Sequence, residues 1–465
     1  MHRPGRISRR RFLQGAGAAA AFPLFSLPAG AGDRPPNFVF ILTDDQRYDT
    51  LSCAGHPFLH TPRLDRLARD GAFFENAFVT TALCSPSRAS FLTGKYPHRH
   101  GVRDNNTPFP AEARTFPRIL REHGYRTAFI GKWHMGTQED PQPGFDHWVS
   151  FPGQGVYRNP VLNINGETKR VPGYITDILT DLGVQWLRER PAGPFCLYLS
   201  HKAVHSDFIP AHRHSGLFTD TIIEPPASIH DTLEGKPEWL RQVKRAGPGA
   251  EYREMAELVR NYCRCLAAVD ESVGRVMRTL QDGGVLDNTL VVFAGDNGFF
   301  FGEHGLSDKR AMYEEAIRIP LLMHFPALIR PGMRVREMAL NIDLCPTLLD
   351  LAGLAIPGDV QGRSLRPLLA GRKIPWRDEF LYEYDWEPDA RRRPAIRGVR
   401  TERWKYIEYP GSANISELYD LRSDPLELHN IAYFQPGTRI EAEMKERLGR
   451  LTQGIPAPRS GPAGA

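Results

Sequence analysis

The stretch Asn37-Phe38-Val39-Phe40-Ile41-Leu42-Thr43-Asp44-Asp45 joins a nearly uninterrupted apolar run to two adjacent carboxylates. Residues 37–42 are rich in Val, Ile and Phe, which is typical of a parallel strand covered on both faces. Runs of the same character occur at residues 126–130, 195–200, 290–294 and 319–325. Pro320 restricts the last run to a strand start or a sheet edge, because proline donates no ladder hydrogen bond. These runs predict a sheet with several buried parallel strands.

Amphipathic helices alternate with these runs. The segment 61–71 has a threonine cap, a proline at the first helical position and a terminal glycine. A longer apolar stripe at helical spacing comprises Met255, Leu258, Val259, Tyr262, Leu266, Val269, Val273, Val276, Met277 and Leu280. The alternation predicts an α/β fold with a large mixed, mostly parallel sheet sandwiched by helices. Ligand sites in such folds collect at the carboxyl ends of the strands.

The pattern changes after about residue 373. Short strand-like runs at 380–382, 395–400, 404–407 and 417–421 are separated by turns, and a polar helix follows near 440–451. They predict a small C-terminal subdomain with an antiparallel sheet. The expected organisation is a leader at 1–31, a large catalytic domain at 32–373, this subdomain at 374–453 and a flexible tail at 454–465.

The leader carries the chain's excess positive charge. The formal net charge is +5, and the first 31 residues contain five arginines and no acidic residue, so the remainder is close to neutral. A near-neutral protein gives no support for nucleic-acid binding. Residues 8–14, Ser-Arg-Arg-Arg-Phe-Leu-Gln, resemble a twin-arginine export signal, and 29–31 resemble a cleavage site. The following apolar run is too short and too rich in Gly and Pro for a stable membrane anchor. We therefore expect periplasmic or secreted protein, exported by the twin-arginine translocase.

The stretch Cys84-Ser85-Pro86-Ser87-Arg88-Ala89-Ser90-Phe91-Leu92-Thr93-Gly94 has the features of a helix start and stop. Ser85 is the expected N-cap, Pro86 the first helical residue and Gly94 the terminator. This interpretation does not explain why Cys84 and Arg88 lie one turn apart. The other cysteines, Cys53, Cys196, Cys263, Cys265 and Cys345, match no disulfide framework or zinc site.

Oxygen-bearing side chains follow two of the predicted strands. Asp44 and Asp45 follow the first, and Asp296 and Asn297 follow the run at 290–294. Each pair alone is compatible with a turn or a helix cap. If the two strand ends converge, the four side chains supply a set of hard ligands without Cys or His. Such a set favours Ca²⁺ or Mg²⁺ over Zn²⁺.

Cationic and titratable side chains follow further strands. Lys132 and His134 follow the run at 126–130, His205 follows the run at 195–200, and Lys309 lies shortly after Asp296. Together they predict an anion pocket. A nearby loop either lines this pocket or is an ordinary solvated loop, which the sequence slightly favours; its residues are Arg99, His100, Arg103, Asp104, Asn105 and Asn106.

These landmarks, in this order, resemble the type I sulfatase family, whose fold is that of alkaline phosphatase. The resemblance spans about residues 36–432 and includes the C-x-P-x-R pattern of Cys84, Pro86 and Arg88. It implies that a formylglycine-generating enzyme oxidises Cys84 to formylglycine, in the cytoplasm before export. The hydrated aldehyde would attack sulfur with one hydroxyl and expel sulfate by means of the second.

The resemblance also implies a role for each landmark residue. One divalent cation, Ca²⁺ with Mg²⁺ as the alternative, would be bound by Asp44, Asp45, Cys84, Asp296 and Asn297. Arg88 would hold the diol, and Lys132 and Lys309 would neutralise sulfate oxygens. His134 and His205 would act as acid–base groups, the latter at the leaving oxygen. Many relatives have Pro at the positions of Val204 and Asp207, so the geometry of this loop is left open.

The expected function is hydrolysis of sulfate esters, with sulfated sugars or glycans as the substrate class. A phosphomonoester or phosphonate-ester hydrolase on the same fold is the alternative, because phosphate and sulfate share a tetrahedral anionic shape. An inactive protein that binds sulfated glycans is a third reading, which the presence of both Cys84 and Arg88 disfavours.

Overall fold

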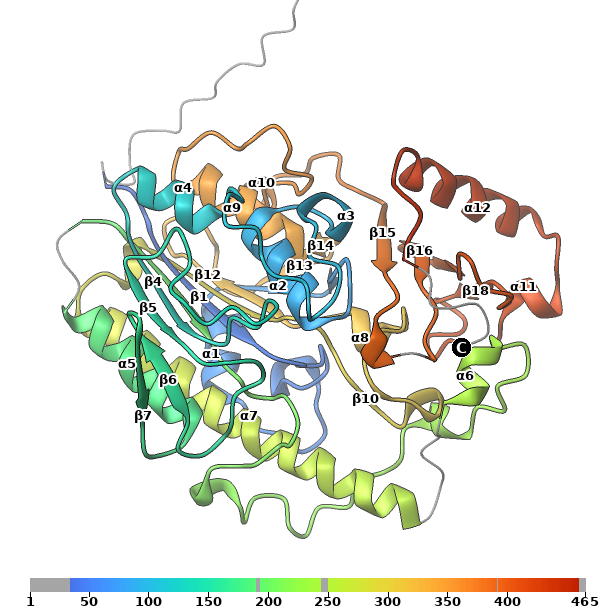
Figure 1. Ribbon diagram of the computed structural model, residues 1–465, viewed down its shortest axis with the longest axis horizontal. Helices are drawn as coiled ribbons and strands as arrows, with labels where there is room; N and C mark the ends of the chain where they lie inside the picture. The colour runs from blue at the N-terminus through green and yellow to red at the C-terminus, as the bar shows by residue number, and fades with distance from the viewer. Residues whose placement is uncertain (1–33, 190–192, 244–249, 391, 460–465) are drawn as a thin grey trace, which may run out of the picture. The chain divides into compact units, whose positions relative to one another are not determined.

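A mixed sheet of ten strands forms the centre of the fold (Figure 1). The computed structural model describes residues 34–189, 193–243, 250–390 and 392–459, so the predicted leader lies outside the described residues. The strands, in spatial order, are β13 (Met333–Val335), β2 (Ala72–Phe74), β12 (Leu321–His324), β9 (Thr289–Gly295), β1 (Asn37–Thr43), β8 (Phe195–Ser200), β4 (Arg126–Gly131), β5 (His147–Ser150), β6 (Val161–Ile164) and β7 (Glu167–Arg170).

The five central strands, β9, β1, β8, β4 and β5, run parallel. Strand β12 runs antiparallel to β9 and starts directly after Pro320, as the sequence predicts. Along β1, Phe38 and Phe40 enter one hydrophobic core and Val39 and Ile41 enter the other. This alternation shows that both faces of the sheet are buried, which explains the nearly continuous apolar runs.

Helices cover both faces of the sheet (Figure 1). One core is completed by α1 (Pro62–Asp70), α5 (Ile175–Glu189) and α7 (Ala250–Asp282). The other is completed by α2 (Cys84–Thr93), α4 (Phe116–Glu122) and α9 (Leu344–Leu351). Of the predicted stripe on α7, Leu258 is 41% exposed, Val259 and Met277 are half-buried and the other members are buried. Within the described residues, no helix has the length and apolar character needed to cross a membrane.

The C-terminal part forms a separate antiparallel sheet in the predicted place (Figure 1). Its strands are β15 (Glu379–Tyr384), β16 (Ile396–Thr401), β17 (Trp404–Glu408) and β18 (Glu417–Asp420). Helix α12 (Arg439–Thr452) covers it through Met444 and Leu448. The chain from Pro35 onward forms one unit, and the boundary after residue 373 stays a prediction.

Short elements complete the fold. The helices are α3 (Pro97–His100), α6 (Glu238–Gln242), α8 (Glu314–Ile317), α10 (Arg366–Leu369) and α11 (Ile431–Phe434). The strands are β3 (Ala77–Phe78), which pairs with β14 (Ala339–Leu340), and β10 (Phe300–Phe301), which pairs with β11 (Ser307–Asp308).

Helix α2 begins two residues earlier than the sequence predicts. Leu83 is its N-cap and Cys84 its first residue, so Ser85 is not the cap and Pro86 is not the first helical residue. The hydroxyl of Ser85 instead donates to the carbonyl oxygen of His134. Gly94 ends the helix as predicted, with a φ of 70° and its N–H bonded to Ser90 O at 2.9 Å. The start at Cys84 places this side chain at the N-terminus of a fully buried helix.

Candidate functional site

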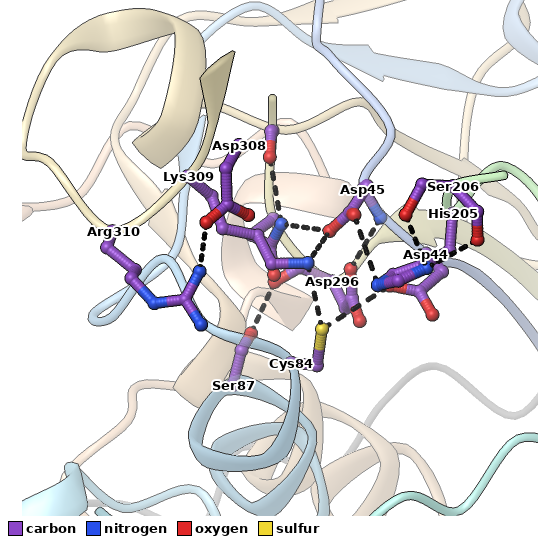
Figure 2. Close-up of polar contacts among 12 residues, drawn as sticks. Asp44, Asp45, Cys84, Ser87, His205, Ser206, Asp296, Asp308, Lys309 and Arg310 are labelled. Atoms are coloured by element: carbon purple, nitrogen blue, oxygen red, sulfur yellow. Dashed lines mark hydrogen bonds and ion pairs between the residues drawn. The ribbon is translucent and has the colours of Figure 1, made fainter. Parts of the chain in front are cut away.

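The carboxyl ends of four neighbouring parallel strands build the candidate site. Asp44 and Asp45 follow β1, Asp296 and Asn297 follow β9, Lys132 and His134 follow β4, and the loop that carries His205 follows β8. Helix α2 presents Cys84 to this edge, and Lys309 arrives directly after β11 (Figure 2). The parallel order of β9, β1, β8 and β4 therefore brings together residues that are up to 265 positions apart in the sequence. The strand ends converge, as predicted.

Three carboxylates form an acidic cluster. Oxygens of Asp44, Asp45 and Asp296 lie within 4.8 Å of one another, and all three residues are fully buried. Two hydrogen bonds stabilise the cluster, one from Asp45 N to Asp296 Oδ1 at 2.9 Å and one from Asn297 Nδ2 to Asp45 Oδ1 at 2.7 Å. Asp45 Oδ2 and Asn297 Oδ1 are buried without a hydrogen-bond partner among the described residues. Buried oxygens without donors fit a hard divalent cation.

Three cationic side chains face these carboxylates. Arg88 Nη2 lies 2.8 Å from Asp296 Oδ2 and 3.4 Å from Asp44 Oδ2. Lys132 Nζ pairs with Asp44, and Lys309 Nζ lies 2.5 Å from Asp45 Oδ1. All three cations are at least 97% buried. Each buried charge therefore has an opposite charge in contact, which is the condition under which buried charges persist.

The thiol of Cys84 lies between Lys309 and Asp44 (Figure 2). Its Sγ is 3.1 Å from Lys309 Nζ and 3.5 Å from Asp44 Oδ1. Burial, assisted by the negative charge of Asp44, raises the pKa of the Cys84 thiol to about 12. The thiol is therefore neutral near pH 7 and a poor nucleophile, because the thiolate is the reactive form.

The two adjacent aspartates titrate in opposite directions. Burial would raise the pKa of Asp44, but Lys132, His205 and Arg88 hold it well below its usual range. Burial raises the pKa of Asp45 to about 7, opposed by Lys309 and reinforced by the charge of Asp44. Repulsion between adjacent carboxylates keeps part of this cluster protonated when only side chains balance it.

The two histidines border the cluster. His205 Nε2 lies 3.7 Å from Asp45 Oδ2, and its Nδ1 lies 2.8 Å from the carbonyl oxygen of Ser206. Burial, followed by the charge of Lys132, lowers the pKa of His205 to about 2 and lowers that of His134 further. His134 Nδ1 is buried without a partner among the described residues. Both rings are neutral in this arrangement, and His205 Nε2 faces Asp45.

The structure corrects part of the expectation for residues 99–106, because Arg99 and His100 belong to α3 and only the others form the loop after it. His100 and Asp104 are buried, whereas Arg99 and Asn106 are exposed, so the loop is not solvated along its whole length. Asp104 is buried because its Oδ1 accepts hydrogen bonds from the backbone N–H groups of Asn106 and Thr107. Asn105 Oδ1 accepts from Ser85 N at 3.1 Å, which ties the loop to the start of α2.

Two partners of the site residues were not predicted from the sequence. Gln154 Oε1 accepts from Lys132 Nζ, and Ser200 Oγ lies 2.7 Å from Arg88 Nη1. Ser200 is the last residue of β8, so its position at a strand end could have identified it as a candidate site residue. Gln154 lies in an irregular connection after β5, and no motif distinguishes it.

Comparison with known proteins gives consistent relatives over most of the chain. A family model described as Sulfatase matches residues 36–354, and one described as N-sulphoglucosamine sulphohydrolase, C-terminal, matches residues 302–454. The N-acetylglucosamine-6-O-sulfatase of Bacteroides thetaiotaomicron is 35% identical over 89% of this chain and 86% of its own length.

Solved structures agree with this result. A protein in complex with its substrate, D-glucosamine-2-N,6-O-disulfate, matches with a TM-score of 0.85 and 33% identity, over 90% of this chain and 98% of that chain. The phosphonate monoester hydrolase of Agrobacterium radiobacter matches with a TM-score of 0.78 and 25% identity, over 90% of this chain and 96% of that chain.

Proposed function

Because this chain belongs to the sulfatase family and is a sulfuric ester hydrolase, we propose that it releases sulfate from sulfated sugars with Cys84, converted to formylglycine, as its nucleophile. One arrangement carries the proposal. Cys84 Sγ lies 3.1 Å from Lys309 Nζ and 3.5 Å from Asp44 Oδ1, at the edge of an acidic cluster with orphaned oxygens. Burial raises the pKa of the Cys84 thiol, so the unmodified side chain is a poor nucleophile, which supports conversion to a more reactive group.

Two groups supply the chemistry that the side chains lack. A hydrated formylglycine provides one hydroxyl to attack sulfur and a second to expel the sulfate. A divalent cation, Ca²⁺ or Mg²⁺, provides Lewis-acid polarisation of a sulfate oxygen. Asp44, Asp45, Asp296 and Asn297 would hold the cation, with the modified side chain of Cys84 adjacent, because the oxygens of the three aspartates converge and Asp45 Oδ2 and Asn297 Oδ1 have no donor.

The cationic side chains would bind and orient the sulfate ester. Lys132 and Lys309 each carry a point charge in a buried site, where charge–charge attraction is stronger than in water. Arg88 is held rigidly by Asp296, Ser200 and the carbonyl oxygen of Lys132, so its guanidinium stays next to residue 84. Fixed cations of this kind stabilise charge that develops on oxygen without reorganising.

The two histidines would move protons, His134 as a neutral base and His205 as an imidazolium that the negative charge of the bound sulfate ester stabilises. His134 would take a proton from the nucleophile, and His205 would deliver one to the leaving oxygen of the sugar. The positions of the rings at the border of the cluster support both roles. The assignment of the base role to His134 and the acid role to His205 is taken from the resemblance to the family.

The names of the relatives favour an amino sugar as substrate. A bacterial relative is an N-acetylglucosamine-6-O-sulfatase, and a solved relative was captured with a glucosamine disulfate. We propose a 6-O-sulfate of a glucosamine-type sugar as the substrate class. The similarity to a phosphonate monoester hydrolase keeps phosphonate and phosphate esters as the competing substrates.

A direct test combines one variant with one mass measurement. Cys84→Ala should abolish release of sulfate from N-acetylglucosamine-6-sulfate while the melting temperature stays near that of the wild type. The Cys84 peptide of active wild-type protein should have the mass of the aldehyde. Full activity of Cys84→Ala, or an active enzyme with only a thiol at this position, would refute the nucleophile. Faster turnover of a phosphate or phosphonate ester than of its matched sulfate ester would favour the alternative.

We also propose export through the twin-arginine translocase, with localisation in the periplasm or outside the cell. Two relatives are named as extracellular sulfatases, in Drosophila melanogaster and Caenorhabditis elegans, which is consistent with an exported enzyme. Replacing Arg9, Arg10 and Arg11 by lysine should leave the protein in the cytoplasm of the host. Unchanged secretion of that variant would exclude this route.

A further inference from the structure

The loop after β8 holds His205 by side-chain contacts rather than by proline. Residues 201–208 contain no proline, so no residue in the loop has a covalently fixed φ. Two backbone hydrogen bonds attach the start of the loop to Asp44, from Asp44 N to Ala203 O at 3.0 Å and from Val204 N to Asp44 O at 2.8 Å. The N–H of Val204 is therefore in use, which a proline at this position would not permit.

Two buried side chains fix the part of the loop that carries His205. The hydroxyl of Tyr157 donates to His205 O at 2.6 Å, and Lys202 Nζ donates to Ser206 O at 3.1 Å. Tyr157 is 2% exposed and Lys202 is 3% exposed. Lys202 Nζ also lies 4.7 Å above the ring of Tyr157, so the two side chains support each other.

The carbonyl oxygen of Ser206 joins these contacts to the imidazole. It lies 2.8 Å from His205 Nδ1 and receives the bond from Lys202 at the same time. A ring whose Nδ1 is bonded to a fixed oxygen has its rotation set, and the opposite nitrogen, Nε2, then points toward Asp45 (Figure 2). Tyr157 and Lys202 thus define where Nε2 lies although neither touches the acidic cluster in any contact described above.

We propose that Tyr157 and Lys202 are positioning residues that aim His205 Nε2 at the leaving oxygen of the sulfate ester. The inference rests on the proposed role of His205. Proton delivery matters when the leaving group is a poor one, such as the alkoxide of a sugar, and matters little when it is a stable phenolate. Loss of either positioning residue should therefore slow sugar sulfates selectively.

The experiment compares two substrates across a set of variants. For Tyr157→Phe and Lys202→Met, kcat for N-acetylglucosamine-6-sulfate should fall about tenfold, the effect of one misplaced hydrogen bond in a transition state. The kcat for 4-nitrophenyl sulfate should change less than about twofold, and KM for the sugar should stay near the wild-type value. Lys202→Arg, which keeps a donor and a charge, should restore part of the lost kcat.

Tyr174→Phe is the matched control. The Tyr174 ring stacks on Tyr157 at 5.9 Å, and no hydrogen bond of its hydroxyl to the His205 loop occurs in the described part of the chain. This variant should turn over both substrates at the wild-type rate. An equal fall on both substrates for Tyr157→Phe, or no fall on either, would overturn the positioning role.

His205→Gln separates this inference from the proposed function. Its loss should be large on the sugar sulfate and small on the aryl sulfate. If it shows no dependence on the leaving group, the role of His205 fails and the positioning role fails with it. If it shows that dependence and Tyr157→Phe and Lys202→Met do not, only the positioning role is overturned.

Discussion

Asp44, Asp45 and Asp296 meet Arg88, Lys132 and Lys309 in a volume closed to solvent, so three potential negative charges face three positive ones. The cationic side chains reduce the repulsion that would otherwise oppose folding of the acidic cluster. We infer that the polypeptide folds before it binds a cation, and that the cation is needed for turnover rather than for the fold.

Removal of metal tests this separation. Exhaustive chelation should abolish sulfatase activity and lower the melting temperature by only a few degrees, because a ligand that binds only the folded state adds a modest stabilisation, about 2.7 kcal/mol at a hundredfold excess over Kd. Added Ca²⁺ should restore both activity and melting temperature. Differential scanning calorimetry and sulfate release give the two readouts. Full activity without metal would contradict the cation site.

A second residue-scale prediction concerns two adjacent glutamates of α8. Burial, reinforced by the charges of Glu303 and Glu427, raises the pKa of Glu315 to about 8. The folded state therefore prefers the neutral carboxyl, and this contribution to the free energy of unfolding is present below about pH 4.5 and is lost as the pH rises to 8. Glu315→Gln should be more stable than the wild type at pH 8 and similar to it at pH 5, measured by urea unfolding.

Glu314 provides the control of opposite sign. Burial would raise its pKa, but Arg400 and Lys405 hold the pKa of Glu314 well below its usual range. Its contribution is present above about pH 4.5 and is lost only in more acidic solution. Glu314→Gln should therefore lose stability at pH 8. If both variants respond to pH in the same direction, the assignment of these two carboxyl groups is wrong.

Among the elements, α2 depends on how it ends. Gly94 adopts a left-handed conformation, and a Cβ there would lie 2.9 Å from Val360 Cγ1 and 3.2 Å from Ile342 O. Gly101 ends α3 in a similar conformation, and no atom lies within 4 Å of its Cβ position in the described residues. Both positions carry the backbone cost of a left-handed L-residue, about 1–2 kcal/mol, but only the first adds a clash.

The comparison of two alanine variants measures that clash. Gly101→Ala should lower the free energy of unfolding by about 1 kcal/mol through the backbone alone. Gly94→Ala should lower it by roughly 1–3 kcal/mol more, because the atoms around it are packed. It should also reduce activity, since α2 carries Cys84 and Arg88. If the two variants are equally destabilised in urea, the atoms around Gly94 move to accommodate the added Cβ and the predicted clash is wrong.

The elements differ in how far the sequence predicts them. The central strands β1, β4, β8 and β9 are predicted because burial on both faces leaves a continuous apolar run. Strands β6 and β7 were not predicted, since β7 is exposed along its length and carries a polar sequence. The start of α2 was predicted two residues late, because the hydroxyl of Ser85 bonds a distant carbonyl instead of capping the helix. Tertiary contacts of that kind leave no local signal.

The same limit applies to the site as a whole. Its predicted members follow strand ends, and the parallel order brings those ends together, so the sequence could predict that Asp44, Asp296, Lys132 and His205 lie at one edge of the sheet. Gln154 and Tyr157, in the connection after β5, contact residues that follow β4 and β8, and Lys202 contacts Ser206 within the loop after β8. The sequence does not show which irregular segments contact one another, because these contacts form only in the folded structure.

At the scale of the whole molecule, a buried charge network joins the C-terminal sheet to the rest of the fold. Lys405 of β17 is fully buried, with its Nζ 3.0 Å from Glu314 Oε1 of α8 and 2.7 Å from Glu427 Oε1. Arg400 of β16 reaches Glu314 at 3.1 Å. Removing one member leaves an uncompensated buried charge.

Two lysine variants test this connection. Lys405→Met should lower the free energy of unfolding by about 3–5 kcal/mol, the effect of breaking a buried pair from one side. Lys445→Met removes the ion pair between the half-exposed Lys445 and Glu441 on α12. This variant should change the free energy of unfolding by less than about 1 kcal/mol. Chemical unfolding gives both values. Similar losses for the two variants would mean that the buried network does not stabilise the junction.

The complete burial of Cys84 has a consequence for biosynthesis. The side chain has no exposed surface, and all ten residues of α2 around it are buried as well. A modifying enzyme has to bind the residues that flank its target, which the folded chain does not offer. The proposed conversion of Cys84 would therefore precede folding, and the two processes would compete for each newly made chain. The fraction of active protein then depends on the relative rates of folding and oxidation, so slower folding at low temperature should raise specific activity without raising the amount of protein.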